Sequence, residues 1–209
     1  MKFTYLWQSP KKWTFQMKKV KRYIEKESFG FCLNLFAGKT KLRIKEIRVD
    51  SSNEFQPDYN MDSLEFIKKW EKEKKPLFDT IILDPPYNLR KANEKYKGHF
   101  TNNWIETLKI VGRILKPNGK IITLGFNSVG LSKSKGFEKE AICLICHGGA
   151  QNDTIIVIEK KIFMPIVNEP RCLPLADNPP RQFNDCNIRV IKKSIIIQKL
   201  YNDGLRGFH

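Results

Sequence analysis

The sequence predicts an α/β fold: a doubly wound, mostly parallel sheet with one antiparallel strand and helices on both faces. Two observations support this prediction. Strand-like and helix-like patterns alternate from residue 30 to residue 126, which is typical of parallel strands joined by crossover helices. Two strand-like segments then follow each other at 140–147 and 154–162, with a glycine-rich turn between them. This last pair predicts a closing hairpin, which supplies the antiparallel strand.

The first expected element is an amphipathic helix near the N-terminus. Trp13, Met17, Val20 and Ile24 follow one another at spacings of four, three and four residues, which places apolar side chains on one helix face. The other face is crowded with lysine, arginine and glutamate. Gly30 is expected to end the helix.

Strands and helices alternate in the segment that follows. Aliphatic and β-branched runs predict the strands, and apolar residues at helical spacing predict the helices. In chain order the strands are 31–38, 42–50, 78–84 and 120–126, and the helices are 62–75 and 103–116. The segment 78–84 is the most apolar strand and is therefore expected to be central.

We expect three parts: an N-terminal segment and helix at 1–29, a main domain at 30–162, and a C-terminal arm at 163–209. The arm begins where the alternating pattern ends. Five prolines lie within the 23 residues that start at Pro165, and this density favours an extended arm over a packed domain.

The composition points to a polyanionic partner. The chain has 209 residues, with 38 lysines and arginines against 22 acidic residues, which gives a formal net charge of +16 and a pI near 9.7. Such a surplus favours nucleic acid as a partner, while the alternative is a charged surface that only maintains solubility. No apolar stretch is long enough for a signal peptide or a membrane span. A soluble, cytoplasmic protein is expected, and five cysteines fit its reducing environment.

The segment "CLICH" at 143–147 suggests two kinds of metal site. It matches the haem-attachment pattern, but that modification requires export. It also offers two cysteines to zinc, with Cys172 and Cys186 as distant partners. Strand alternation explains Cys143 and Cys146 as structural residues that face opposite ways. We therefore expect no metal site.

The stretch "FDTIILDPPY" ends the expected central strand abruptly. Pro85 and Pro86 cannot donate backbone hydrogen bonds, so they mark the end of the strand. Asp84 and Tyr87 are left on a stiff turn at the carboxyl edge of the sheet. Ligands bind at this edge in open α/β sheets.

Three further residues follow strand ends. Gly38, in "NLFAGKT", lets the backbone approach a ligand without a Cβ in the way, although the segment lacks the spacing of a phosphate-binding loop. Asp50 ends the next strand, where an acid commonly accepts hydrogen bonds from ribose hydroxyls; a solvent-exposed loop acid is the alternative. Asp62 opens the helix 62–75 and, with Glu65, is spaced like a capping box.

Together, "LFAGKT" and "IILDPPY" resemble the S-adenosylmethionine-dependent amino-methyltransferases, which methylate exocyclic amino nitrogens of nucleic acid bases. That family carries a glycine motif after its first strand and an Asp-Pro-Pro-Tyr-type motif after its fourth. "LKPNGKIITLGFN" resembles its fifth strand and the helix before it. The resemblance covers about residues 8 to 160 and implies a Rossmann-like class I methyltransferase fold with a seven-stranded sheet. It also implies S-adenosylmethionine as the cofactor.

The resemblance assigns roles to individual residues. The segment after the first strand would line the amino-acid end of the cofactor, an acid would hold its ribose, and another would face its adenine. One departure is Lys39-Thr40, which stands where the family usually has another glycine or a serine; a lysine there would suit a carboxylate. The cofactor-binding candidates are, in order, Phe36, Ala37, Gly38, Lys39 and Thr40, then Asp50 for the ribose, Asp62 for the adenine, and Gln8 and Ser9 as weaker candidates.

The same resemblance places the target base at Asp84, Pro85, Pro86 and Tyr87. The Asp84 side chain and the Pro85 carbonyl would each accept one amino hydrogen, and Tyr87 would stack on the extruded base. The basic residues that follow would contact phosphates, or would form a solvated loop instead. These nucleic-acid-binding candidates are Arg90, Lys91, Lys95 and Lys97.

The function that these residues favour is transfer of a methyl group to the exocyclic amino group of adenine in DNA. Aspartate as the first residue of the tetrapeptide favours adenine within the family. Two alternatives remain: an RNA base-amine methyltransferase, and a catalytically silent, methyltransferase-like subunit that only binds nucleic acid. No long insert separates Gly38 from Asp84. Target recognition is therefore expected from the 88–102 loop, from the C-terminal arm, or from a partner subunit or second copy in a homodimer.

Overall fold

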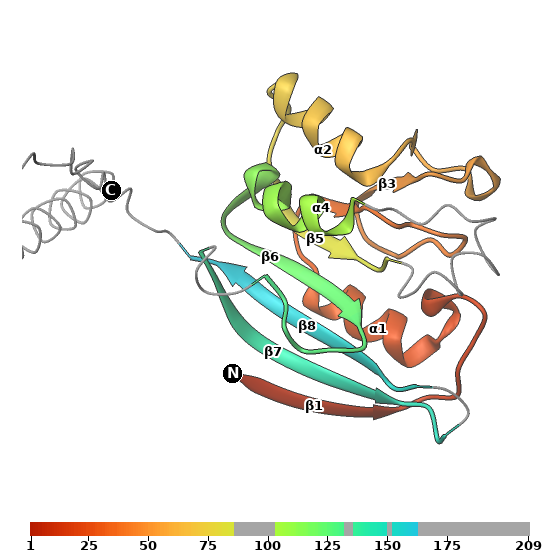
Figure 1. The fold of residues 1–209 in the computed structure, drawn as a ribbon. Helices are drawn as coiled ribbons and strands as arrows, with labels where there is room; N and C mark the ends of the chain where they lie inside the picture. The colour runs from red at the N-terminus through yellow and green to blue at the C-terminus, as the bar shows by residue number, and fades with distance from the viewer. Residues whose placement is uncertain (86–102, 132–135, 150–151, 163–209) are drawn as a thin grey trace, which may run out of the picture. The chain divides into compact units, whose positions relative to one another are not determined.

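The computed structural model describes residues 1–85, 103–131, 136–149 and 152–162. The chain divides into two compact units, Met1–Pro165 and Ile166–His209, and all described residues belong to the first. Within them the sheet has eight strands in the order β1-β7-β8-β6-β5-β2-β3-β4 (Figure 1). The strands are β1 (Lys2–Trp7), β2 (Cys32–Asn34), β3 (Glu46–Asp50), β4 (Tyr59–Asn60), β5 (Phe78–Leu83), β6 (Leu115–Gly125), β7 (Phe137–Cys146) and β8 (Thr154–Lys161).

The predicted fold class is confirmed. Strand β8 runs antiparallel to both of its neighbours, β6 and β7, and every other pairing in the described sheet is parallel. The expected hairpin is formed by β7 and β8. Strand β5 lies in the interior of the sheet, between β6 and β2, as its apolar sequence predicts.

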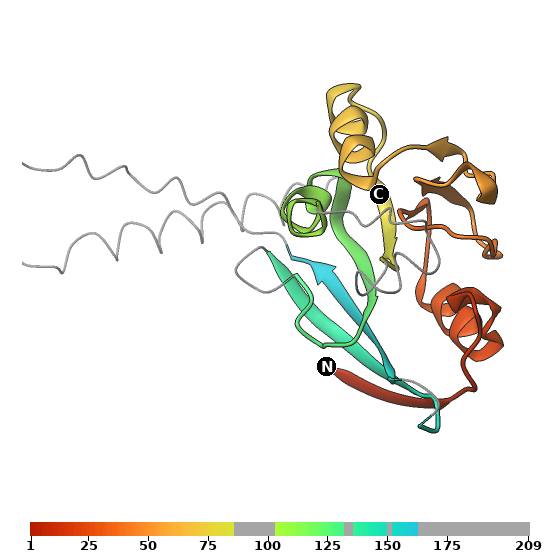
Figure 2. The same cartoon turned by 45° about the vertical axis from the view of Figure 1, so that its right-hand side comes forward.

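Helices cover both faces of the sheet. Helix α1 (Lys18–Glu27) packs its buried Val20 and Ile24 against one face, together with Ile82, Ile122 and Cys143. Helices α2 (Ser63–Lys72) and α4 (Trp104–Ile110) cover the other face, followed by the 3-10 turn η3 (Val111–Ile114). Two views of the ribbon show the sheet between these two layers (Figures 1 and 2).

Several elements differ from the sequence-based prediction. The N-terminal helix begins at Lys18, and the residues before it form the short 3-10 turn η1 (Thr14–Gln16), although Met17 still packs in the core. The Pro-Asn-Gly turn at 117–119 is a bulge inside β6. Asn118 has φ +62°, and the pairing with β5 shifts from Phe78–Leu115 to Thr80–Lys120.

Strand β1, like the two-residue strand β4, is one that the sequence pattern did not indicate. It pairs in parallel with β7 and forms one edge of the described sheet. Its aromatic residues Phe3, Tyr5 and Trp7 alternate along the strand and are 66%, 58% and 53% exposed. Because the large apolar side chains point to solvent, the segment lacks the apolar-in, polar-out alternation that identifies a half-buried strand.

The described part of the chain contains no helix long and apolar enough to cross a membrane. It also contains no group of three histidine, cysteine or acidic side chains that could hold a metal ion. Cys143 is fully buried and Cys146 is partly buried, so the two side chains differ in environment as strand alternation predicts.

Hydrogen bonds and an ion pair anchor the amino end of β5. Asp79 accepts a hydrogen bond from the Phe31 amide at 2.8 Å, and its carboxylate forms an ion pair with Lys116 at 2.8 Å. Thr80 Oγ1 donates to the Phe29 carbonyl. Gly30 has φ +64°, and a side chain there would collide with the Asp79 carboxylate. Only glycine therefore allows this loop to close on Asp79.

We predict that Asp79→Ala destabilises the fold in a pH-dependent way. The hydrogen bond from Lys116, with that from the Phe31 amide, lowers the pKa of Asp79. The folded protein therefore binds this proton more weakly than the unfolded chain, and the contribution to stability is present above about pH 4 and lost as pH falls through the folded-state pKa. Urea unfolding at neutral pH should show a loss of about 1–2 kcal/mol.

The matched control is Glu106→Ala, which removes an exposed ion pair with Lys109 and should change stability by less than about 0.5 kcal/mol. If Asp79→Ala lowered the free energy of unfolding by the same amount at every pH from 7 down to 3, the result would contradict a role for the ionised carboxylate.

Candidate functional site at the carboxyl edge of the sheet

Three adjacent parallel strands, β5, β2 and β3, end at one edge of the sheet. Asn34 of β2 pairs with Ile82 of β5 on one side and with Arg48 of β3 on the other. Phe36 and Asp84 lie just past the ends of β2 and β5, and Asp50 is the last residue of β3, so these three predicted site residues stand at the same edge of the sheet. The chain continues from β2 to β3 and β4 on one side and then crosses to β5 and β6 on the other. This reversal makes a topological switch point, where open α/β sheets bind ligands.

The backbone continues this arrangement past the strand ends. The Leu35 amide donates to the Ile82 carbonyl, and the Ala37 amide donates to the Val49 carbonyl, both at 3.1 Å. Ala37 is buried, so it contributes to the site through its backbone. Phe36 is partly buried and packs edge-on against Trp104, with ring centroids 5.9 Å apart.

Asp50 holds the turn after β2. Its Oδ2 accepts a hydrogen bond from the Gly38 amide at 2.9 Å, and its Oδ1 accepts one from the Ser52 amide at 2.9 Å. The side chain is only 6% exposed. Burial raises the pKa of Asp50, while the two amide hydrogen bonds and Arg48 oppose that rise. Each carboxylate oxygen retains a lone pair with which it could accept one further hydrogen bond.

Arg48 is a site-supporting residue that the sequence reasoning missed. Its Nη2 donates to the Gly38 carbonyl at 2.6 Å, and the guanidinium also bonds the Phe55 and Gln56 carbonyls. Gly38 is thus held at its amide by Asp50 and at its carbonyl by Arg48. The sequence does carry a signal for this residue, because an arginine interrupts the buried-strand pattern "EIRVD". A buried arginine needs several hydrogen-bond acceptors nearby.

The space beside the Gly38 Cα, where a side chain would stand, is open. Its φ is +53°, and an added Cβ would meet only Trp13 Cε3 at 3.9 Å, an ordinary contact distance. Trp13 also packs edge-on against Phe55, with centroids 5.0 Å apart. The sequence assigned Trp13 to a helix stripe, whereas the structure places it beside the glycine turn. Lys39, the next residue, is exposed, and Thr40 is partly exposed.

Asp62 caps helix α2. Its Oδ1 accepts hydrogen bonds from the Leu64 amide at 2.8 Å and the Glu65 amide at 3.3 Å. This confirms its expected place at the start of the helix. The predicted contact with a cofactor adenine stays a prediction.

Gln8 does not lie beside the carboxyl end of β2. It follows β1, and four strands separate β1 from β2 in the sheet. Its backbone amide donates to the Cys146 carbonyl, and its side-chain Oε1 accepts from the Lys19 amide. Its backbone carbonyl lies 2.8 Å from His147 Nδ1. These contacts join β1, β7 and the start of α1. Ser9 beside it is exposed.

The base-binding motif is described only in part. Asp84 is partly buried and Pro85 is buried at the end of β5. The other predicted residues of this group lie outside the described residues: Pro86, Tyr87, Arg90, Lys91, Lys95 and Lys97.

The sequence matches no family model and no curated protein. Solved structures resemble the chain at low identity. A candidate S-adenosylmethionine-dependent methyltransferase from Streptococcus mutans is 14% identical over 68% of this chain, with a TM-score of 0.50. The alignment spans 48% of that protein, so this chain corresponds to about half of its length.

Two further structures fall below that TM-score. A candidate methylase from Haemophilus influenzae is 14% identical over 70% of this chain and 88% of its own, with a TM-score of 0.43. The N-methyltransferase NodS from Bradyrhizobium japonicum, in complex with S-adenosylhomocysteine, is 10% identical over 66% and 81%, with a TM-score of 0.44. Similarity at this identity shows the fold alone. The observed sheet order and the Streptococcus mutans structure together show that the described chain has a Rossmann-like methyltransferase fold.

Proposed function

We propose that this chain is an S-adenosylmethionine-dependent methyltransferase that acts on the exocyclic amino group of adenine in DNA. The observation that carries the proposal is that Phe36, Asp50 and Asp84 all stand at the carboxyl ends of three adjacent parallel strands. The fold supports methyl transfer, since the similar protein from Streptococcus mutans is described as S-adenosylmethionine-dependent. The net charge of +16 supports nucleic acid as the substrate.

The residues at the glycine turn fit the proposed cofactor. Gly38 has open space where a side chain would stand, so the methionine half can pass close to the backbone. Asp50 has lone pairs left for ribose hydroxyls after binding two amides. Lys39 is exposed beside the turn and can pair with the cofactor carboxylate. Asp62 already caps α2 through Oδ1, which leaves Oδ2 to accept from the adenine.

The proposed chemistry needs no covalent bond to the protein. The cofactor supplies an electrophilic methyl group on a sulfonium. The amino nitrogen of adenine is a weak nucleophile because its lone pair is delocalised into the ring. The Asp84 carboxylate and the Pro85 carbonyl would each accept one amino hydrogen, which favours a pyramidal nitrogen with a localised lone pair. Methyl transfer to this nitrogen would break the carbon–sulfur bond of the cofactor, and the amino proton that is lost would pass to Asp84 or to solvent.

This arrangement catalyses by position and electrostatics. The carbonyl of Pro85 would be restricted because the residue is buried directly after β5, its ring limits φ, and the proline that follows limits ψ. Tyr87 would stack on a base extruded from the duplex, since a stacked base cannot reach the edge of the sheet.

The reaction itself is tested with labelled S-adenosylmethionine. The protein is incubated separately with duplex DNA and with RNA, and the digested nucleosides are identified. Label on the amino group of deoxyadenosine supports the proposal. Label only in RNA would replace DNA by RNA as the substrate, and no label in either would reject nucleic acid methylation.

The cofactor site is tested with Gly38→Val. We predict that this variant folds but no longer binds S-adenosylmethionine, because the branched side chain enters the space beside the turn. The left-handed backbone should cost about 1–2 kcal/mol of stability. Gly149→Val is the matched control: Gly149 also has a positive φ, +79°, and nothing lies within 4 Å of an added Cβ.

Calorimetric titration of both variants compares the cofactor affinities directly, and thermal unfolding measures the shared cost of strain. Retained affinity in Gly38→Val would remove the glycine turn from the cofactor site. Equal loss of affinity in both valine variants would attribute the effect to strain rather than to position.

The catalytic role of Asp84 is tested with two substitutions. We predict that Asp84→Ala keeps its fold and its cofactor affinity while turnover falls by roughly two or more orders of magnitude, as when a charge-stabilising partner is removed. Asp84→Asn should lose less, since the amide oxygen still accepts a hydrogen bond. If Asp84 only stabilises the end of β5, both variants should melt earlier and retain the turnover of each folded molecule.

A further inference from the structure

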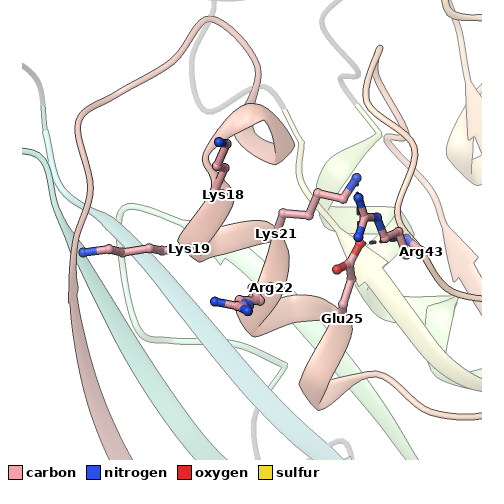
Figure 3. A pocket seen from close by; sticks show the side chains of 6 residues that line it. All are labelled: Lys18, Lys19, Lys21, Arg22, Glu25 and Arg43. Carbon is pink, nitrogen blue, oxygen red and sulfur yellow. Dashed lines mark hydrogen bonds and ion pairs between the residues drawn. The ribbon is translucent and has the colours of Figure 1, made fainter.

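A groove with a volume of about 390 Å³ lies along helix α1, on the side of the sheet opposite α2 and α4. Figure 3 shows its side chains projecting from the helix and from the segment before β3. The groove is lined by Lys18, Lys19, Lys21, Arg22, Glu25 and Arg43. We call it the α1 groove.

The charges of the α1 groove are strongly unbalanced. Five of its six lining residues are basic, and the one acid is already engaged. Glu25 Oε1 accepts a hydrogen bond from the Arg43 amide at 2.7 Å and lies 3.8 Å from Lys21 Nζ. Among the described residues, neither Lys18 nor Arg22 has an acidic partner. The groove therefore has a surplus of positive charge facing solvent.

This distribution is unfavourable for helix α1 by itself. Lys18, Lys19, Lys21 and Arg22 fall within its first five residues, and its first turn contains no acid. The amino end of a helix carries partial positive charge and prefers acidic side chains. Cations three or four residues apart, such as Lys18 and Arg22, also repel each other. A bound polyanion would offset both effects, whereas helix stability alone would favour other residues here.

Contacts connect the α1 groove to the candidate cofactor turn. Lys21 Nζ donates to the Lys41 carbonyl at 2.5 Å, and Arg43 bonds Glu25 through its backbone amide. Lys41 and Arg43 both belong to the segment between Gly38 and β3. Trp13, just before α1, contacts the space beside Gly38. An extended anion in the groove would therefore lie beside the segment that joins the glycine turn to β3.

We propose that the α1 groove binds the phosphate backbone of the DNA that the proposed methyl transfer modifies. The inference rests on the proposed function for the identity of the partner, and on the groove itself for the binding surface. Successive lysines and arginines along a groove suit a series of phosphates, because each cation can neutralise one of them. Contacts of this kind position the strand without reading its sequence. Base selection would then depend on other residues.

The test removes three charges from the groove. The variant Lys18→Gln, Arg22→Gln and Arg43→Gln changes exposed side chains and keeps the backbone contact between Arg43 and Glu25. Its matched control is Lys68→Gln, Lys69→Gln and Lys72→Gln, which removes three exposed cations from α2 on the opposite face. Both triple variants have the same net charge. Binding of a fluorescein-labelled DNA duplex is measured by anisotropy at several salt concentrations.

We expect the groove variant to bind DNA more weakly and to flatten the slope of log affinity against log salt by about two to three units. The α2 variant should keep most of the wild-type slope, and both should keep the wild-type cofactor affinity. Equal slopes in the groove variant and the wild type would overturn the inference. An equal loss in both triple variants would also overturn it, because net charge alone would then explain the binding.

The outcome separates this inference from the proposed reaction. Groove-dependent DNA binding without any methylated nucleoside would support the α1 groove and reject the methyl transfer. Methylated deoxyadenosine with unchanged binding by the groove variant would support the reaction and reject the groove. Groove-dependent binding of an RNA hairpin that exceeds that of the DNA duplex would overturn DNA as the partner.

Discussion

Strand β5 is enclosed on both faces, and the rest of the structure depends on that enclosure. Thr80, Ile81, Ile82 and Leu83 have no exposed surface, since α1 covers one face of the sheet and the α2 and α4 layer covers the other. A carboxylate cannot be placed within such a strand without a large desolvation cost. The acids of β5 therefore stand at its two ends. Asp79 anchors the amino end, and Asp84 is left at the carboxyl end, where a ligand can approach.

The glycine turn after β2 is organised by charge rather than by packing. The Asp50 carboxylate accepts from the Gly38 amide and the Arg48 guanidinium donates to the Gly38 carbonyl, so two opposite charges from one strand hold the peptide groups on both sides of one residue. Both side chains are nearly fully buried, which strengthens their hydrogen bonds relative to the same bonds in water. The turn is thereby held in one conformation before any ligand arrives. Such preorganisation reduces the entropy lost on binding.

Sequence patterns predicted the fold well where burial determines the residues. Strand β5 and the β7–β8 hairpin are apolar because they are enclosed, and Asp62 precedes α2 because a helix start needs an acceptor. The patterns failed where a tertiary contact overrides the local preference. Strand β1 exposes its aromatic residues and is a strand only because it pairs with β7. Pro117–Gly119 predicts a turn, yet β5 pairs with Leu115 before it and with Lys120 after it, so it lies within β6 as a bulge.

The candidate site divides in the same way. Asp50, Gly38 and Asp84 could be found because strand ends at a parallel edge meet in space. Trp13 and Arg48 were missed, because their partners lie in segments that are separate in the sequence and only the arginine within a buried strand pointed to one of them. Gln8 was placed by resemblance alone, and its observed partners join it to β7 and α1 instead. Motif spacing thus identifies the candidate residues at strand ends better than the residues that support them.

The position of β1 has a consequence for how the chain folds during synthesis. Its end is tied to the β7–β8 hairpin by the contact between Gln8 and His147, which are 139 residues apart in the sequence. A ribosome makes β1 before any of the other described strands, but its pairing partner β7 is made after most of the sheet. Until then the aromatic strand has no neighbour to pair with, and exposed unpaired strands favour aggregation. Closing so long a loop is also slow, so the edge of the sheet should be completed last.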